Sequence, residues 1–172
     1  PAVQIEVLGP PPTSGTRDAF IELVMDLGCA SFPAIIQLQG DDRQIACQSM
    51  REDGLFIEAG ENDNMIVQRL GVNDSALGIF GYSFLVQNLD RVQGASIDGV
   101  SPEFDNISNG SYPISRPLYF YLKSAHVGII PGLNEFLIEF TDENAIGEFG
   151  YLTDRGLIPM SEEEFMQIRT AA

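Results

Sequence analysis

Residues 9–20, with the sequence GPPPTSGTRDAF, connect a strand pattern to a helix pattern. In residues 3–7 apolar Val and Ile alternate with polar Gln and Glu, which predicts a half-buried strand. In residues 20–27 apolar side chains recur at spacings of three and four, which predicts a helix with one apolar face. Gly28 is expected to end that helix.

The loop places Ser14, Gly15 and Thr16 at the helix N-terminus. The first backbone N–H groups of a helix have no partner within it, and the helix dipole adds partial positive charge there. Glycine lets a ligand approach the backbone and the two hydroxyl groups add donors, so the loop has the features of an oxyanion site. Ser and Thr are equally typical of an N-cap that binds nothing. Three prolines stiffen the entry to the loop, which favours a preorganised site.

The composition indicates a globular chain with an acidic surface. Of its 172 residues, 44% are hydrophobic, and the net charge is −16. Only nine residues are Lys or Arg, so nucleic acid is excluded as a partner. No apolar run approaches the roughly 20 residues of a membrane helix, so no direct membrane insertion is expected. Because the chain begins at Pro1 on a strand pattern, we interpret it as a mature or trimmed chain without a signal peptide.

Strand and helix patterns alternate along the rest of the chain. Helices are expected at 42–50, 65–70, 82–88, 102–110, 132–140, 144–152 and 161–169. Strands are expected at 55–58, 76–82, 92–100 and 117–122, and the last of these is rich in aromatic residues. This alternation predicts an α/β fold.

The chain has two cysteines, Cys29 and Cys47. An isolated pair favours a disulfide in an exported protein, whereas two buried thiols are expected in the cytosol. Each cysteine lies in or next to a predicted helix, so a bond between neighbouring helices is sterically feasible. The spacing matches no zinc motif and the single histidine, His126, cannot complete one, so no metal site is expected.

Four ordered blocks resemble the second half of the periplasmic phosphate-binding proteins of bacterial phosphate ABC transporters. The blocks are TSGTRDAF at 13–20, ALGIFGYSF at 76–84, YPISRPLY at 112–119, and GYL at 150–152 with GLIP at 156–159. The resemblance implies a type II periplasmic-binding-protein-like lobe with a central mixed sheet flanked by helices. It implies a single α/β domain over 1–172, the C-terminal portion of a two-lobed protein, with a ligand-binding lobe at about 1–122 and a helical segment at 123–172.

The function that the resemblance implies is binding of inorganic phosphate between two lobes, without chemical conversion and without a cofactor. The family's Ser-Gly-Thr element corresponds to residues 14–16, which would donate hydrogen bonds to phosphate oxygens. Many members carry an arginine and an aspartate where this chain has Pro10 and Pro12. We expect Arg17 to supply the missing charge as a bidentate donor and Asn62 to reach the ligand, or a bridging water, from a second loop. The alternative for Asn62 is a solvated loop that binds nothing.

Both arginines near these blocks have a simpler interpretation. Arg17 also fits a solvent-facing side chain paired with a nearby acid such as Asp18 or Glu22. For Arg116 a surface position is expected, with a place near the hinge between the lobes as the alternative.

The resemblance also implies an exported, periplasmic protein whose partner is the membrane permease of the transporter. In that setting a Cys29–Cys47 disulfide is expected. The family's first lobe lies outside this chain. An apolar surface that this lobe would otherwise cover would be exposed and would favour self-association.

Two other classes of function compete with phosphate binding. An enzyme that hydrolyses or transfers phosphate esters would use Ser14, but the chain lacks a Gly-x-Ser-x-Gly motif, a P-loop lysine and a second histidine. No catalytic residue is therefore predicted. A non-catalytic interaction module fits the acidic surface but leaves the Ser-Gly-Thr loop and the four blocks unexplained.

Overall fold

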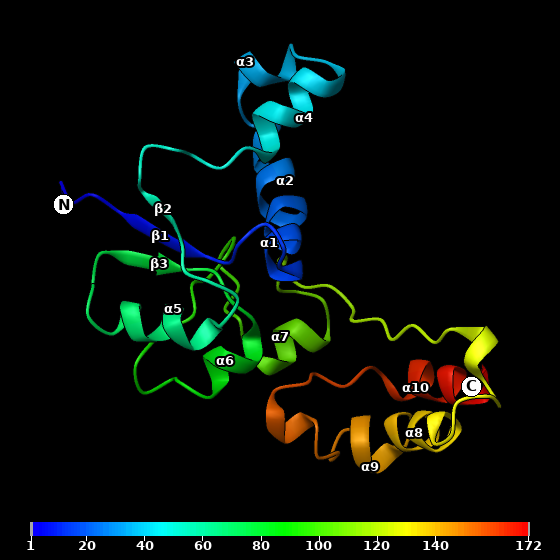
Figure 1. Cartoon of the computed structure of the whole chain (residues 1–172). Coiled ribbons are helices and arrows are strands. Elements are labelled where there is room, and N and C mark those ends of the chain that lie inside the picture. Colours follow the sequence, from blue (N-terminus) through cyan, green and yellow to red (C-terminus); the bar gives the residue numbers. More distant parts are fainter. Residues whose placement is uncertain (1, 172) are drawn as a thin grey trace.

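A three-stranded parallel sheet organises the first half of the chain in the computed structural model, which describes residues 2–171 (Figure 1). The strands are β1 (Glu6–Gly9), β2 (Phe56–Glu58) and β3 (Ala76–Gly78). β1 lies between the other two, and Val7 pairs with Phe56 on one side and Leu77 on the other. The predicted α/β class is confirmed. The predicted mixed sheet is wrong for the described residues, because both pairings are parallel.

The helix predicted after the Ser-Gly-Thr loop forms as one continuous helical segment. Its parts are α1 (Gly15–Phe20), the π-helical turn η1 (Ile21–Met25) and α2 (Asp26–Cys29). The segment ends one residue beyond Gly28, and Ala30 caps it. In Figure 1 it stands beside the sheet and carries α3 (Pro33–Ile36) and α4 (Gly40–Gln48) at its far end.

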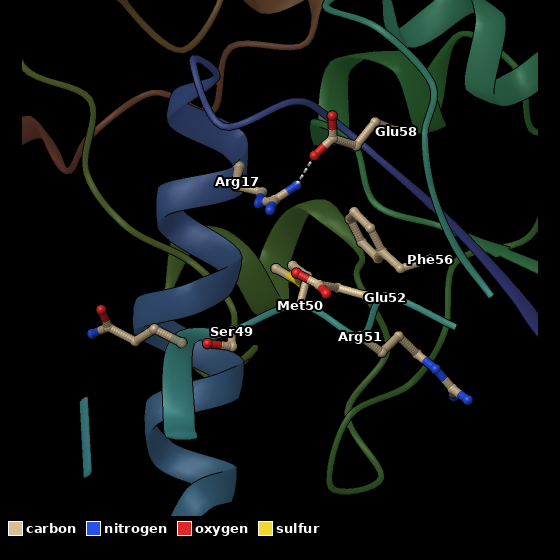
Figure 2. A pocket seen from close by; sticks show the side chains of 8 residues that line it. Arg17, Ser49, Met50, Arg51, Glu52, Phe56 and Glu58 are labelled. Atoms are coloured by element: carbon tan, nitrogen blue, oxygen red, sulfur yellow. Dashed lines mark hydrogen bonds and ion pairs between the residues drawn. The ribbon is translucent and has the colours of Figure 1, made fainter. Parts of the chain in front are cut away.

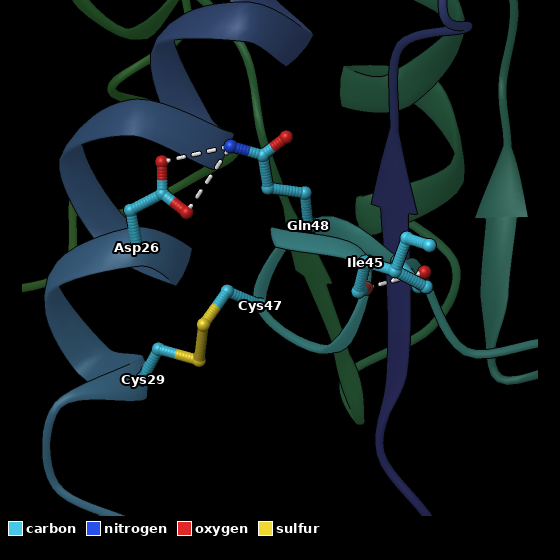
Figure 3. The surroundings of a disulfide bond; sticks show 6 residues. Asp26, Cys29, Ile45, Cys47 and Gln48 are labelled. Carbon is cyan, nitrogen blue, oxygen red and sulfur yellow. Dashed lines mark hydrogen bonds between the residues drawn. A yellow bond between two sulfur atoms is a disulfide. The ribbon is translucent and has the colours of Figure 1, made fainter. Parts of the chain in front are cut away.

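The predicted disulfide between Cys29 and Cys47 is confirmed. The bond joins the end of α2 to α4, with Cα atoms 5.5 Å apart and both residues buried (Figure 3). Next to it, the Gln48 side-chain amide donates to the Asp26 carboxylate at 3.0 Å. These contacts tie α4 to the long helical segment, so α4 is held although it lies away from the sheet.

The main core lies between the sheet and α5 (Asp63–Leu70), which follows β2. Leu8 of β1 is 2% exposed and Ile66 of α5 is 0% exposed. A Cβ at Gly78 would lie 2.7 Å from the Leu70 side chain, so only glycine lets β3 approach this helix so closely. β3 then leads into α6 (Tyr82–Val86).

Residues 92–100 do not form the predicted strand. Ile97 and Val100 instead face each other in an isolated antiparallel bridge across Asp98 and Gly99. These two residues have φ angles of 50° and 82°. An Asp-Gly pair favours such a tight turn, so the chain reverses inside the predicted strand. α7 (Phe104–Ser108) follows, within the predicted helical range.

The aromatic strand predicted at 117–122 is also wrong, because this segment pairs with no strand in the described chain. Leu118 is 81% and Tyr121 84% exposed, whereas the Phe120 ring lies 4.8 Å from that of Phe140. Figure 1 shows the segment as an open connection to the C-terminal helices. Backbone groups of a strand need a neighbour to bond with, and the apolar pattern alone does not supply one.

The C-terminal region contains the predicted helices, but the one expected at 144–152 ends already at Ile146. Its helices are α8 (Leu133–Phe140), α9 (Glu143–Ile146) and α10 (Glu162–Ala171), with short turns η2 (Ser124–His126) and η3 (Thr153–Arg155). Ala145, Ile146 and Phe165 form a second, smaller core. A Cβ at Gly156 would lie 2.5 Å from the Cα atom of Ser83, so this region touches α6 closely. None of the described helices has the length and apolar character needed to span a bilayer.

Candidate anion-binding site at the start of helix α1

Three helix N-termini gather at one edge of the parallel sheet. Each strand runs in the same direction, so each ends at this edge, where α/β proteins bind their ligands. Ser14 is the N-cap of α1 after β1, Asn62 is the N-cap of α5 after β2, and Gly81 is the N-cap of α6 after β3. The first two loops touch each other, because the Thr13 hydroxyl donates a hydrogen bond to the Glu61 carboxylate.

The first turn of α1 carries hydrogen-bond donors that the protein leaves open. Ser14 Oγ accepts a hydrogen bond from the Thr16 amide at 3.3 Å, so the hydroxyl proton of Ser14 remains available for another acceptor. Gly15 is exposed, and its amide donates to no acceptor in the described chain. The Thr16 hydroxyl also has no protein partner among the described residues. Ser14 is therefore an N-cap, and the turn still offers three donors to an anion.

Arg17 does not point into solvent as the simpler interpretation required. Its Nη1 atom donates to the Pro10 carbonyl at 3.2 Å and pairs with the Glu58 carboxylate at 3.1 Å. Its guanidinium lies 5.0 Å from the centre of the Phe56 ring, a cation–π arrangement. The side chain is only 12% exposed and borders an open hollow of about 370 Å³ beside β2 (Figure 2). The acid that pairs with Arg17 thus comes from β2, across the loop.

Arg116 is a second guanidinium at the first turn of α1, and the sequence analysis placed it only on the surface or near a hinge. Its Nη2 atom donates to the Gly15 carbonyl at 2.9 Å. Its Nη1 atom lies 3.4 Å from the Glu22 carboxylate, so Glu22 pairs with Arg116 and not with Arg17. This contact joins residues 101 positions apart, which no local pattern reveals. The one signal in the sequence was that Arg116 belongs to the YPISRPLY block.

The protein's own side chains also bond to the second and third helix starts. Asn62 Oδ1 accepts a hydrogen bond from the Asn64 amide at 3.0 Å, whereas its Nδ2 has no partner in the described chain. The Asp63 carboxylate accepts from the Gly81 amide at 3.3 Å, so a carboxylate of the protein already lies at the start of α6. Burial raises the pKa of Asp63, and the hydrogen bond from Gly81 partly opposes that shift. The start of α1 differs from the start of α6 in that no carboxylate of the described chain accepts a hydrogen bond from its backbone amides.

The chemistry of this edge suits an anion. Hydroxyl, amide and guanidinium groups donate hydrogen bonds to negatively charged oxygens. Within residues 2–171 the structure contains no cluster of three or more His, Cys, Asp or Glu residues that could hold a metal ion.

The chain belongs to the PBP superfamily, because residues 1–144 match the family described as "PBP superfamily domain". Curated relatives support this membership. The chain is 28% identical over 142 residues to the phosphate-binding protein PstS of Staphylococcus saprophyticus, which covers 80% of this chain and 37% of that protein. It is 27% identical over 159 residues to the phosphate-binding protein PstS of Bacillus subtilis, which covers 92% of this chain and 43% of that protein.

A solved structure supports the same fold. The crystal structure of PstS from Borrelia burgdorferi superimposes with a TM-score of 0.56 at 12% identity, covering 94% of this chain and 55% of that one. These matches confirm the resemblance inferred from the four sequence blocks. The chain spans less than half the length of the curated relatives named above.

Proposed function

We propose that this chain forms one side of a phosphate-binding site in the substrate-binding protein of a phosphate ABC transporter. The observation that carries the proposal is the first turn of α1, where the Gly15 amide and two hydroxyl groups are open to solvent-borne anions. A helix N-terminus of this kind favours a phosphate oxygen through both its free N–H groups and its dipole. The relatives named phosphate-binding protein PstS support phosphate as the anion.

In this proposal Ser14, Gly15 and Thr16 donate hydrogen bonds to phosphate oxygens. Arg17 supplies positive charge through the guanidinium nitrogens that are not bonded to the loop carbonyl or the β2 carboxylate. Asn62 contributes its Nδ2 donor from the neighbouring loop. The ligand is bound and released unchanged, because Ser14 Oγ accepts a hydrogen bond from the Thr16 amide and, among the described residues, donates none to a side chain that could act as its base.

The proposal extends to the setting of the protein. Residues 1–122 serve as the ligand-binding lobe and residues 123–172 as a helical segment, and a second lobe closes over the phosphate. The protein works outside the cytoplasm, in the periplasm or its equivalent, and delivers phosphate to the membrane permease of the transporter. The Cys29–Cys47 disulfide supports this location, because disulfides persist in oxidising compartments.

Isothermal titration of the intact protein with phosphate tests the site. We expect the double variant Thr16→Ala/Arg17→Ala to lose phosphate binding, because it removes a hydroxyl donor and the nearby charge. A matched control, Arg169→Ala/Thr170→Ala, removes the same two residue types from α10, away from the site, and should bind as the unchanged protein does. Sulfate serves as the control anion. Unchanged phosphate affinity in the Thr16/Arg17 variant would refute the site assignment.

A further inference from the structure

We propose that Arg116 is a positioning residue for the anion site, because its guanidinium holds and polarises the peptide group between Gly15 and Thr16. The inference rests on the proposed phosphate site at the start of α1. It adds to that site a residue from a segment that the sequence analysis left without a role in binding.

The contact acts on a single peptide group. The Gly15 carbonyl oxygen and the Thr16 amide nitrogen belong to the same planar unit, so fixing one end fixes the direction of the other. Arg116 Nη2 lies 2.9 Å from the oxygen, and the Thr16 amide faces Ser14 Oγ at 3.3 Å. A cation bonded to the carbonyl draws electron density toward it, which makes the N–H at the other end a stronger donor to Ser14 Oγ. The Ser14 hydroxyl, polarised and oriented by that bond, then donates more strongly to the anion.

Arg116 is itself held in place from two sides. Glu22, about two turns further along the helical segment, pairs with its Nη1 atom at 3.4 Å. On its own segment, the neighbouring Ser115 hydroxyl donates to the Tyr112 carbonyl at 2.9 Å and tightens the turn that presents the arginine. The ion pair limits the orientations of the guanidinium, and the turn fixes the backbone from which the side chain projects.

Gly15 leaves room for this arrangement. A Cβ built at Gly15 would meet a single neighbour within 4 Å, the Nη2 atom of Arg116 at 3.9 Å. The guanidinium therefore flanks the exposed peptide without covering the Gly15 amide, which remains open. Arg17, by contrast, bonds to the carbonyl of Pro10 in the loop before the helix. The two arginines thus fix different peptides of the same loop.

The first test is spectroscopic and needs no ligand. In the ligand-free protein we expect Arg116→Gln to move the ¹⁵N resonance of Thr16 upfield, because the carbonyl of its own peptide group loses a charged donor. Arg91→Gln is the matched control, since it removes the same charge from an exposed arginine elsewhere, and it should leave that resonance in place. An unmoved Thr16 resonance in Arg116→Gln overturns the inference.

The second test is phosphate affinity, measured at low salt and at about 1 M salt. We expect Arg116→Gln to weaken phosphate binding about tenfold, as loss of a charge-assisted hydrogen bond implies, and Arg91→Gln to bind normally. Arg116→Lys keeps the charge and should recover part of the loss. The loss should persist at high salt, where the Debye length is ~3 Å. A loss that disappears at high salt indicates attraction by net charge alone and overturns the positioning role.

The two proposals fail in different ways. If the unsubstituted intact protein binds no phosphate, the proposed function fails and the positioning role fails with it. If that protein binds phosphate and Arg116→Gln binds it equally well, the proposed function stands and only the role of Arg116 is refuted. Arg116→Lys guards against loss of the fold, because it preserves the ion pair with Glu22.

Discussion

The sheet region, residues 6–86, and the C-terminal region, residues 117–171, bury their apolar side chains to different extents. In the sheet region Leu8 and Ile66 are almost completely buried between β1 and α5. In the C-terminal region Ile138 on α8 is 69% exposed, and the segment 117–122 lies largely open. The sheet region owes its packing to strands that pair over long distances in the sequence, whereas the C-terminal helices complete their hydrogen bonds locally. Stability is therefore expected to concentrate around the sheet.

A pair of isoleucine truncations tests this contrast most strongly. Ile66→Ala should lower the free energy of unfolding by about 3–4 kcal/mol, because it leaves a cavity in a fully buried site. Ile138→Ala makes the same chemical change on an exposed helix face and should cost less than about 1 kcal/mol. Urea denaturation measures both values. Equal losses would show that the two regions do not differ in packing as described.

Removal of the disulfide should have the next largest effect. Cys29→Ser/Cys47→Ser opens a link across 18 positions and should cost about 3 kcal/mol of unfolding free energy. The loss should appear in hydrogen exchange of α4, with little change in α8. The unreduced native protein should also resist thiol alkylation, and two freely reacting thiols would contradict the bond.

Two glycine substitutions compare the packed core with the open site. Gly78→Ala should destabilise the protein by about 1–3 kcal/mol, because the new methyl group meets the Leu70 and Ile66 side chains. Gly15→Ala should leave stability nearly unchanged, because its methyl group meets only Arg116 at 3.9 Å.

The same Gly15→Ala variant should weaken phosphate binding, since the methyl group occupies the approach to the open amide. Thermal unfolding and phosphate titration of both variants separate the two effects. If a folded Gly15→Ala protein binds phosphate with full affinity, phosphate does not approach the Gly15 amide.

Asp63 gives the smallest effect, a pH dependence. Burial raises its pKa in the folded state above the ordinary value of 3.8, so the folded protein holds the Asp63 proton more tightly than the unfolded chain does. Stability relative to an Asp63→Asn variant should therefore fall as the pH rises from below 3.8 through the folded pKa, and then stay level. Melting temperatures of both proteins across this range provide the measurement. A difference that grows with pH would contradict the raised pKa.

The local parts of the fold could be predicted from the sequence, and the long-range parts could not. Residues 20–27 and 132–140 have helical apolar spacing, and a helix forms its backbone hydrogen bonds within its own segment. Both helices therefore appear where expected. The strand pattern at 117–122 says nothing about whether a neighbouring strand exists, and Asp98-Gly99 turns the chain inside another predicted strand. The self-association expected from an exposed apolar face stays a prediction, which sedimentation at rising concentration tests.

In the candidate site, too, the local features could be predicted from the sequence and the tertiary contacts could not. The positions of Ser14, Gly15 and Thr16 at a helix start followed from the order of strand, loop and helix, and the structure places them there. Their binding role stays a prediction. The pairing of Arg17 with Glu58 and the approach of Arg116 to Gly15 depend on tertiary contacts, which one sequence does not reveal.

The central claim is that phosphate binds at the first turn of α1, and a phosphate titration of the intact ¹⁵N-labelled protein followed by NMR tests it most directly. The account predicts saturable shifts of the Gly15 and Thr16 amide resonances, with far smaller shifts for amides in α8. Saturable phosphate binding that leaves the Gly15 and Thr16 resonances in place would contradict the account.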